Sequence, residues 1–154
     1  MTSPAVEAVA ASGIEYRVVE HGPVSSLAEA AAVRGVEIAD IVKTIVVRVA
    51  AGDYRFVLVP GGRVISWPKL RALLGVARMS MPDAATAKAA TGYERGTITP
   101  FGSTTAWPVI ADERIRGREI SLGGGRHGVA LAVQADSVIE VLRATVADIS
   151  EPGD

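Results

Sequence analysis

Lys43 is the residue whose surroundings most suggest chemistry. It lies within IVKTIVV, residues 41–47, which we expect to form a strand that is apolar, and therefore buried, on both faces. An ammonium group in such a strand must find a polar partner, reach a cavity or lower its pKa. Alternatively, its stem extends along apolar neighbours to the edge of the sheet. The sequence leaves both interpretations open.

The segment GTITPFGS, residues 96–103, is the second candidate. It contains two glycines and a proline but no charged residue, and Ile98 and Phe101 make it unusually apolar for a loop. A stiff loop of this kind can direct several main-chain N–H groups at one point, which suits an oxyanion or the oxygen of an ester. The alternative is a structural turn, although an exposed turn would gain nothing from the two apolar side chains.

A third segment, GGGRHG at 123–128, formally matches the glycine pattern of dinucleotide-binding loops. We exclude that function because the pattern requires a helix to follow, whereas GVALAV continues as a strand. Gly124 and Gly125 then either let the backbone approach a ligand or form a plain tight turn.

Two further residues are weaker candidates. His21 is one of only two histidines, and it is either a general base or an ordinary histidine of a surface turn. Asp112 ends the predicted strand WPVIAD and either serves a site or caps a short helix. We expect no metal site, because two histidines without suitably spaced carboxylates do not make one.

Composition limits the class of protein. The chain has 154 residues, 49% of them hydrophobic, no cysteine and a net charge of −1. These values predict one domain and exclude disulfides, thiol catalysis and cysteine-based zinc sites. A near-neutral protein is a poor binder of long nucleic acid, but contact with a few terminal nucleotides is compatible with this charge. No apolar run is long enough to cross a membrane and no signal peptide is recognisable, so we expect a cytoplasmic protein.

Periodicity and capping residues predict a compact α+β domain around a mixed β-sheet with flanking helices, over residues 1–150, followed by a disordered tail at 151–154. The predicted helices are 4–12, 25–35, 67–75, 83–91 and 137–145, the last capped by Asp136 or Ser137. The predicted strands are 15–20, 41–49, 54–59, 64–66, 97–99, 107–112, 119–122, 128–133 and an edge strand at 145–149.

Together these segments resemble the YbaK/ProX/EbsC family of aminoacyl-tRNA deacylases, whose domain is also inserted in many bacterial prolyl-tRNA synthetases as an editing domain. The resemblance extends from about residue 15 to residue 150, with Arg95 where the family often has proline and Thr99 where serine is frequent. The matching stretches are IVKTIVV, FVLVPGGRVISWPKL, TGYERGTITPFG, PVIADE and GGGRHGVALAV.

The resemblance implies hydrolysis of the ester between an amino acid and the 3′-terminal ribose of tRNA, without a cofactor. By analogy, main-chain N–H groups between Gly96 and Gly102 would stabilise the oxyanion. Lys43 would hold the terminal phosphate or ribose, or else orient the loop.

The same resemblance suggests a substrate and partners. Ile98, Thr99, Pro100 and Phe101 would bind the substrate, and a pocket of limited size suggests alanine, cysteine or serine attached to a proline tRNA. The partners that the resemblance implies are the tRNA acceptor end and prolyl-tRNA synthetase. Two other functions stay open: a non-catalytic module that binds an aminoacyl end or an amino acid, and a hydrolase of small esters unrelated to tRNA.

Overall fold

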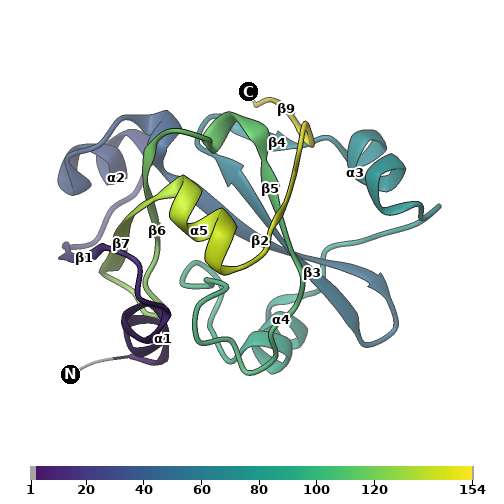
Figure 1. The fold of residues 1–154 in the computed structure, drawn as a ribbon, viewed down its shortest axis with the longest axis horizontal. Coiled ribbons are helices and arrows are strands. Elements are labelled where there is room, and N and C mark those ends of the chain that lie inside the picture. The colour runs from purple at the N-terminus through teal and green to yellow at the C-terminus, as the bar shows by residue number, and fades with distance from the viewer. Residues whose placement is uncertain (1–2, 154) are drawn as a thin grey trace.

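The central sheet is built from two consecutive β-branched strands. The computed structural model describes residues 3–153, in which β2 (Val42–Ala50) and β3 (Asp53–Pro60) form the predicted antiparallel hairpin. β3 pairs in parallel with β5 (Val109–Asp112), and β5 pairs in parallel with β8 (Thr145–Ala147). The result is a four-stranded mixed sheet with β2 at one edge (Figure 1).

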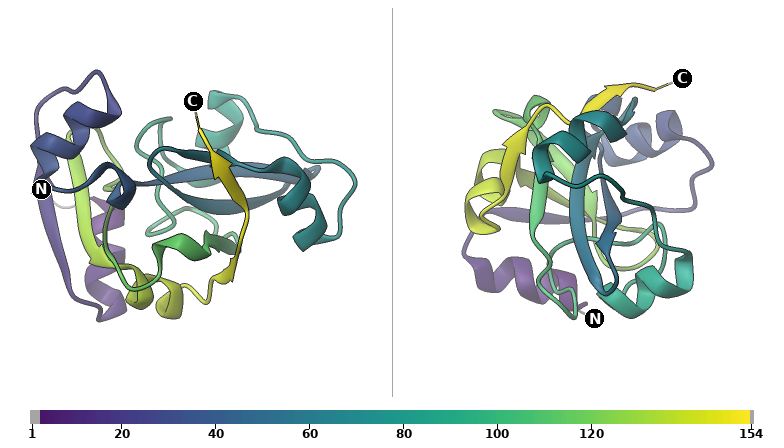
Figure 2. Two further views of the ribbon diagram at one scale, coloured as in Figure 1. Left: turned by 90° about the horizontal axis from the view of Figure 1, so that it is seen from above. Right: turned by 90° about the vertical axis from the view of Figure 1, so that its right-hand side faces the viewer.

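A second, antiparallel sheet stands at one end of the molecule, next to α1 and α2 (Figure 2). Its strands, in spatial order, are β1 (Tyr16–Glu20), β7 (Val129–Gln134) and β6 (Glu119–Gly123). A parallel bridge between Ile41 and Ser121 connects this sheet to the start of β2. β6 therefore covers the outer edge of the sheet where β2 begins, and the rest of that edge is not paired with β6.

Side-chain caps fix where most helices begin. The Ser26 hydroxyl accepts a hydrogen bond from the Glu29 amide, and the Asp83 carboxylate accepts one from the Thr86 amide. The helices are α1 (Pro4–Ser12), α2 (Leu27–Arg34), α3 (Trp67–Leu74), α4 (Ala84–Thr91) and α5 (Ala135–Val141), with 3₁₀ turns η1 (Ile38–Asp40) and η2 (Glu113–Ile115). Among residues 3–153, none of these helices is long and apolar enough to span a bilayer.

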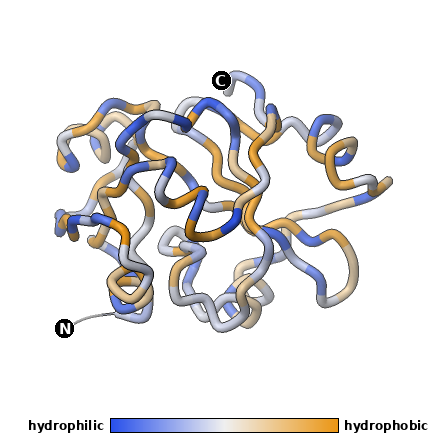
Figure 3. Tube along the Cα trace, in the orientation of Figure 1, coloured by the Kyte–Doolittle hydropathy of each residue, from blue (hydrophilic) through white to orange (hydrophobic). Residues whose placement is uncertain are grey.

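β3 separates two hydrophobic clusters because it is buried on both faces. Phe56 and Leu58 pack into the larger cluster with β6, β7 and α5, and Val57 and Val59 pack into a second cluster with Leu70 of α3. Apolar residues accordingly run along the central strands in Figure 3. This core holds β2 and β3 rigidly, and so fixes the positions of residues along the edge of β2.

The predicted fold class is confirmed, but three details differ. Residues 97–99 form no strand, since they pack inside a loop instead of pairing. α5 begins at Ala135, ahead of both expected caps. The expected tail contributes β9 (Ser150–Pro152), which pairs with β4 (Arg63–Ile65), while residue 154 lies outside the described residues.

Candidate functional site

A cavity of about 480 Å³ lies along the outer edge of β2, and we call it the Lys43 cavity. Its size falls within the range of roughly 300–1,000 Å³ that is common for small-molecule sites. The wall is mostly apolar, with a few cationic side chains. Its lining residues are Arg34, Ile41, Val42, Lys43, Thr44, Ile45, Val46, Met81, Pro82, Ala87, Arg95, Gly96, Ile98 and Gly123.

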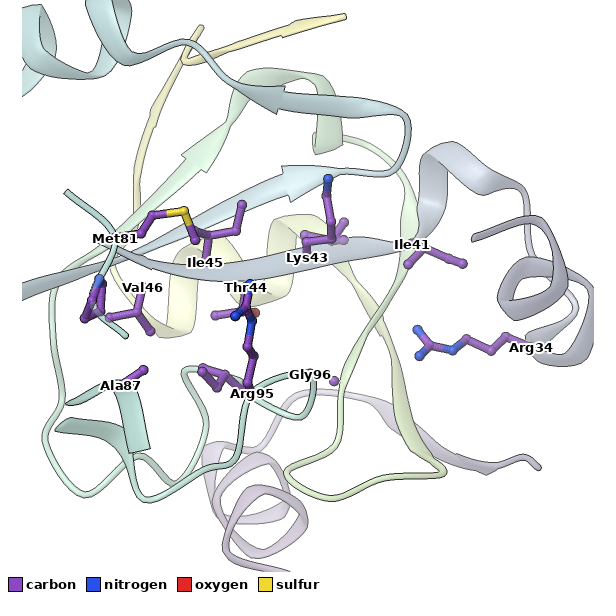
Figure 4. A pocket seen from close by; sticks show the side chains of 14 residues that line it. Arg34, Ile41, Lys43, Thr44, Ile45, Val46, Met81, Ala87, Arg95 and Gly96 are labelled. Atoms are coloured by element: carbon purple, nitrogen blue, oxygen red, sulfur yellow. The ribbon is translucent and has the colours of Figure 1, made fainter. Parts of the chain in front are cut away.

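Both faces of β2 contribute to this cavity because it wraps around the strand edge. Successive strand residues point to opposite faces, and Figure 4 shows Lys43 and Ile45 on one side of β2 with Thr44 and Val46 on the other. Arg95 extends toward β2 on the Thr44 side in the same view. The cavity thus joins an ammonium on one face of the strand to a guanidinium on the other.

Lys43 is only partly buried and has a single protein acceptor among the described residues. Its Nζ donates to the Arg63 main-chain carbonyl over 2.8 Å. Burial lowers the pKa of this lysine, and no carboxylate pairs with it in residues 3–153 to oppose that effect. An ammonium has three N–H donors, so two remain for a ligand. No hydrogen bond joins the ammonium to the 96–103 loop in the described chain.

The first half of the glycine–proline loop faces the cavity. Gly96 adopts a φ of +88°, which disfavours side chains, and both Gly96 and Ile98 line the wall. The Thr97 amide donates back to the Glu94 carbonyl, whereas the amides of Gly96 and Ile98 have no protein acceptor among residues 3–153. Two residues of the cavity wall thus have main-chain amides that the described chain does not use.

The second half of the loop is buried against the rest of the protein. Thr99 and Phe101 are buried, and Phe101 belongs to the larger hydrophobic cluster. A Cβ on Gly102 would come within 2.4 Å of the Pro4 carbonyl oxygen of α1. Burial raises the pKa of Tyr93 to about 12, so its phenol stays protonated and donates to the Phe101 carbonyl over 2.6 Å. The second half therefore holds the loop in a fixed position against the rest of the protein.

Of the predicted loop residues, the structure therefore brings Gly96 and Ile98 to the cavity with Lys43. Thr99, Pro100, Phe101 and Gly102 are not among the residues that line it. Ile98 can contact a ligand directly, whereas the other four support the segment that does.

The GGG segment supports the same loop. The Gly125 amide donates to the Thr97 carbonyl over 3.1 Å, and a Cβ on Gly123 would lie 3.0 Å from the Ile98 carbonyl oxygen. Gly124 packs against Val129, where a Cβ would come within 2.5 Å of that side chain. Gly124 and Gly125, for which the sequence left a ligand contact and a tight turn open, thus approach other parts of this chain. Of the three consecutive glycines, Gly123 lines the Lys43 cavity.

His21 lies in a second cavity of about 550 Å³, which we call the His21 cavity. The two cavities have Arg34, Gly96 and Gly123 in common, so they adjoin. His21 Nδ1 lies 2.9 Å from the Gly22 carbonyl oxygen, and its Nε2 is buried without a protein partner.

Asp112 lies away from both cavities, in an ion-pair network at the end of β5. Its side chain is fully buried and accepts hydrogen bonds from the Arg114 and Ile149 amides and from the Arg114 guanidinium. Burial opposes ionisation, but hydrogen bonds from Ser150, Arg114 and Ile149 outweigh it and lower the pKa of the carboxyl. Of the two interpretations offered by the sequence, this geometry is that of a cap.

The family model for the aminoacyl-tRNA editing domain matches residues 21–141, more than half of the chain. The chain belongs to this aminoacyl-tRNA editing domain family. Among curated proteins, none matches it.

Two solved structures resemble this editing domain over nearly its whole length. One is the crystal structure of the hypothetical protein APE2540, with 29% identity, a TM-score of 0.88, and 97% of this chain and 100% of that chain covered. The other is the crystal structure of "a putative trans-editing enzyme for prolyl tRNA synthetase", with 26% identity, a TM-score of 0.88, and coverage of 98% and 99%.

The sequence did not single out three polar residues that line the editing domain's Lys43 cavity. Thr44 could have been found, since it follows Lys43 on a strand and must face the opposite side. Arg34 gave no signal, because a basic residue in the last turn of a helix is common for electrostatic reasons. Arg95 was noted as a departure from the family's usual proline, and its place in the wall follows from the loop's path alone.

Proposed function

We propose that the protein is a trans-acting aminoacyl-tRNA deacylase of the cytoplasm, which hydrolyses a small amino acid from mischarged proline tRNA. Membership in the editing-domain family supports the tRNA ester as the substrate class. The similarity to a structure described as a putative trans-editing enzyme for prolyl tRNA synthetase supports proline tRNA and that synthetase as partner.

One observation carries the proposal: the Lys43 cavity combines two unpaired amides with positive charge in a largely apolar enclosure. Gly96 and Ile98 supply the amides, and Lys43 and Arg95 supply the charge. Preorganised N–H groups in a partly dry site stabilise the negative oxygen that develops when water attacks an ester. Gly102 takes no part, because it faces α1.

The reaction needs little from the side chains. Water adds to the ester carbonyl carbon and gives up a proton, and the carbonyl oxygen becomes negative. The carbonyl then re-forms, and the bond to the ribose oxygen breaks as that oxygen takes up the proton. The products are a free amino acid and a tRNA with an intact 3′ end. Loss of one oxyanion donor typically costs about 2.7–4 kcal/mol of transition-state stabilisation. Lys43 positions the ribose or the ester through its two unused N–H groups and does not act as a neutral base.

Selectivity follows from the wall of the cavity. Val46, Ala87 and Ile98 line it with apolar side chains, and Val46 and Ile98 also pack in the larger hydrophobic cluster, which leaves them little room to move. Exclusion of large amino acids by steric clash is effective, whereas discrimination among small ones is worth only about 1–3 kcal/mol per methylene. Alanine, cysteine and serine are therefore the candidates.

A deacylation assay tests the proposal. Proline tRNA is charged in turn with alanine, cysteine, serine and proline, and the loss of each ester is followed with and without the protein. We expect at least one small amino acid to be released much faster than proline. Release of none of the three would contradict the proposal.

One observation favours a second function, a module that binds aminoacyl ends without hydrolysing them. Among the described residues, the lining of the Lys43 cavity includes no histidine, aspartate or glutamate to act as a general acid or base. The same set of charged tRNAs separates the two functions when binding is measured beside ester loss, because tight binding of every charged tRNA without ester loss would support the binding module.

A further inference from the structure

Arg34 is a partly buried cation without an anionic partner. It ends α2 and lies where the Lys43 cavity and the His21 cavity meet. Its Nη1 donates to the Ser121 hydroxyl over 3.2 Å, and its Nε is buried without any protein partner in residues 3–153. No carboxylate of the described chain forms a salt bridge with it, which leaves most of its five N–H donors for something outside the protein.

The surroundings of Arg34 are positive. Arg126 lines the His21 cavity and Arg95 lines the Lys43 cavity, and neither forms a salt bridge within residues 3–153. Among the described residues, the salt bridges include a single lining residue of either cavity, the exposed His127, whose Nε2 lies 3.5 Å from Glu94. A partly buried guanidinium supported by two further cations is suited to an oxyanion, and its planar fork matches phosphate best.

The position of the two cavities suggests where such a phosphate would belong. They adjoin, because Arg34, Gly96 and Gly123 line both of them. Figure 4 shows the Arg34 side chain pointing from α2 toward Gly96, close to Ile41 just before the start of β2. A ligand that fills the first cavity with its acyl end would pass Arg34 as it continues into the second.

We infer that Arg34 binds the phosphodiester that links the last nucleoside of an RNA 3′ end to the preceding nucleotide, and that the His21 cavity holds this nucleotide. The inference rests on the proposed function, since it takes the acyl end in the Lys43 cavity as its starting point. It places the phosphate at Arg34 and leaves Lys43 for the ribose or the ester.

His21 fits the same assignment. Because Nδ1 faces the Gly22 carbonyl, the neutral ring carries its proton there and leaves the buried Nε2 as an acceptor. A ribose hydroxyl beside the phosphate would supply the missing donor. Arg34 and His21 together would thus recognise one phosphate and one sugar, which explains two buried polar atoms that otherwise have no partner.

Two stable probes test this inference by calorimetry. The first is the trinucleotide CCA with alanine joined to its 3′ end through an amide, and the second is the same alanylamide on adenosine without any phosphate. We expect wild-type protein to bind the trinucleotide more tightly, with an advantage that shrinks as salt rises. Arg34→Gln should weaken trinucleotide binding about 10- to 100-fold and leave nucleoside binding unchanged.

Two further variants complete the design. Arg34→Lys keeps the positive charge but lacks the planar guanidinium with its paired N–H donors. It should therefore bind the trinucleotide more weakly than wild type but more tightly than Arg34→Gln does. Arg116→Gln changes an exposed arginine that lines neither cavity, and should bind both probes like wild type. Equal thermal unfolding midpoints of the variants would show that the fold is intact.

The inference is overturned if wild-type protein binds the trinucleotide no better than the nucleoside, or if Arg34→Gln weakens both probes equally or neither. Because the probes cannot be hydrolysed, the outcome is independent of catalysis. If binding depended on the phosphate and on Arg34 but tRNA were not deacylated, the phosphate site would be supported and the deacylase activity contradicted. If tRNA were deacylated but binding did not depend on Arg34, the deacylase activity would be supported and the phosphate site contradicted.

Discussion

Two arginines near the central sheet, Arg114 after β5 and Arg34 beside the start of β2, have contrasting partners. At the end of β5, Arg114 Nη1 donates to Asp112 over 3.2 Å and to Asp148 over 2.8 Å, and Lys69 pairs with Asp148 as well. Hydrogen bonds to Asp148 and Asp112 raise the pKa of Arg114. At the edge of β2, Arg34 has only a neutral hydroxyl as partner, and burial lowers its pKa.

This difference separates structural from functional charge. Around Arg114 each cation has an anion, so the network stabilises the fold and leaves nothing for a ligand. Around Arg34 the protein bears the cost of desolvating positive charge without compensation. Such an uncompensated site is expected where a ligand later provides the missing anion. The following predictions test this comparison, from the largest expected effect to the smallest.

Asp112→Ala should be the most destabilising change. It removes a fully buried carboxylate that accepts hydrogen bonds from Arg114 and the Ile149 amide, so the free energy of unfolding should fall by about 3 kcal/mol. Denaturant unfolding measures this loss. Deacylation per folded molecule should stay at the wild-type rate, and a loss of activity in well-folded Asp112→Ala would break the comparison.

Two glycine variants of the loop should differ in the property that they change most: Gly102→Ala should mainly lower stability, and Gly96→Ala should mainly lower the deacylation rate. Both glycines have positive φ, so alanine costs about 1–2 kcal/mol at either position. Gly102→Ala also clashes with the Pro4 carbonyl and should lose the larger amount of unfolding free energy. Gly96→Ala finds only the His127 ring, at 3.8 Å, and should instead lower the deacylation rate by shifting the cavity amides. If both variants lost only stability, the loop would be a structural turn.

Lys43→Met should reduce activity without loss of stability. The substitution removes a desolvated ammonium and keeps an unbranched apolar stem, so the free energy of unfolding should be unchanged or higher. The deacylation rate should fall at least about tenfold, which corresponds to 1.4 kcal/mol of lost interaction. A wild-type rate in single-turnover assays would exclude a role for Lys43 at the ester.

The loss of stability at acidic pH should depend on the ion pairs that Asp148 forms with Arg114 and Lys69. Hydrogen bonds from Arg114, then from Lys69, lower the pKa of Asp148 to about 2. Because the carboxyl ionises more readily in the folded state, its contribution is present above about pH 4 and is lost as the pH falls toward 2. Asp148→Asn should lower the melting temperature at neutral pH and flatten its decline between pH 4 and 2. An unchanged decline would show that the network is not coupled to stability.

Most of the fold could be predicted from local patterns. The hairpin of β2 and β3 and the capped helices follow from β-branched runs, Ser26, Asp83 and terminal glycines, all of which act within a few residues. The predictions were wrong where contacts between residues far apart in the sequence determine the secondary structure. Residues 97–99 look like a strand, but tertiary packing buries them as a loop, and β9 forms only because β4 lies alongside it.

The site could be predicted only in part. Lys43, Gly96 and Ile98 stood out because an unusual residue type appeared within an apolar stretch, and the structure brings all three to one cavity. Arg34 could not be identified, since its importance lies in the carboxylate that is missing around it and not in its own sequence context. The burial of Gly102 against α1 likewise depends on a contact between residues about a hundred positions apart.

A substitution that fills the cavity tests the central claim most directly, namely that the acyl ester is hydrolysed in the space beside β2. Ala87 lines this cavity from α4, and the exposed Ala89 on the same helix provides a matched control. Single-turnover deacylation of alanyl-tRNA by Ala87→Leu should be at least about tenfold slower than by Ala89→Leu, with similar unfolding midpoints for both. Equal rates for the two variants would contradict the account.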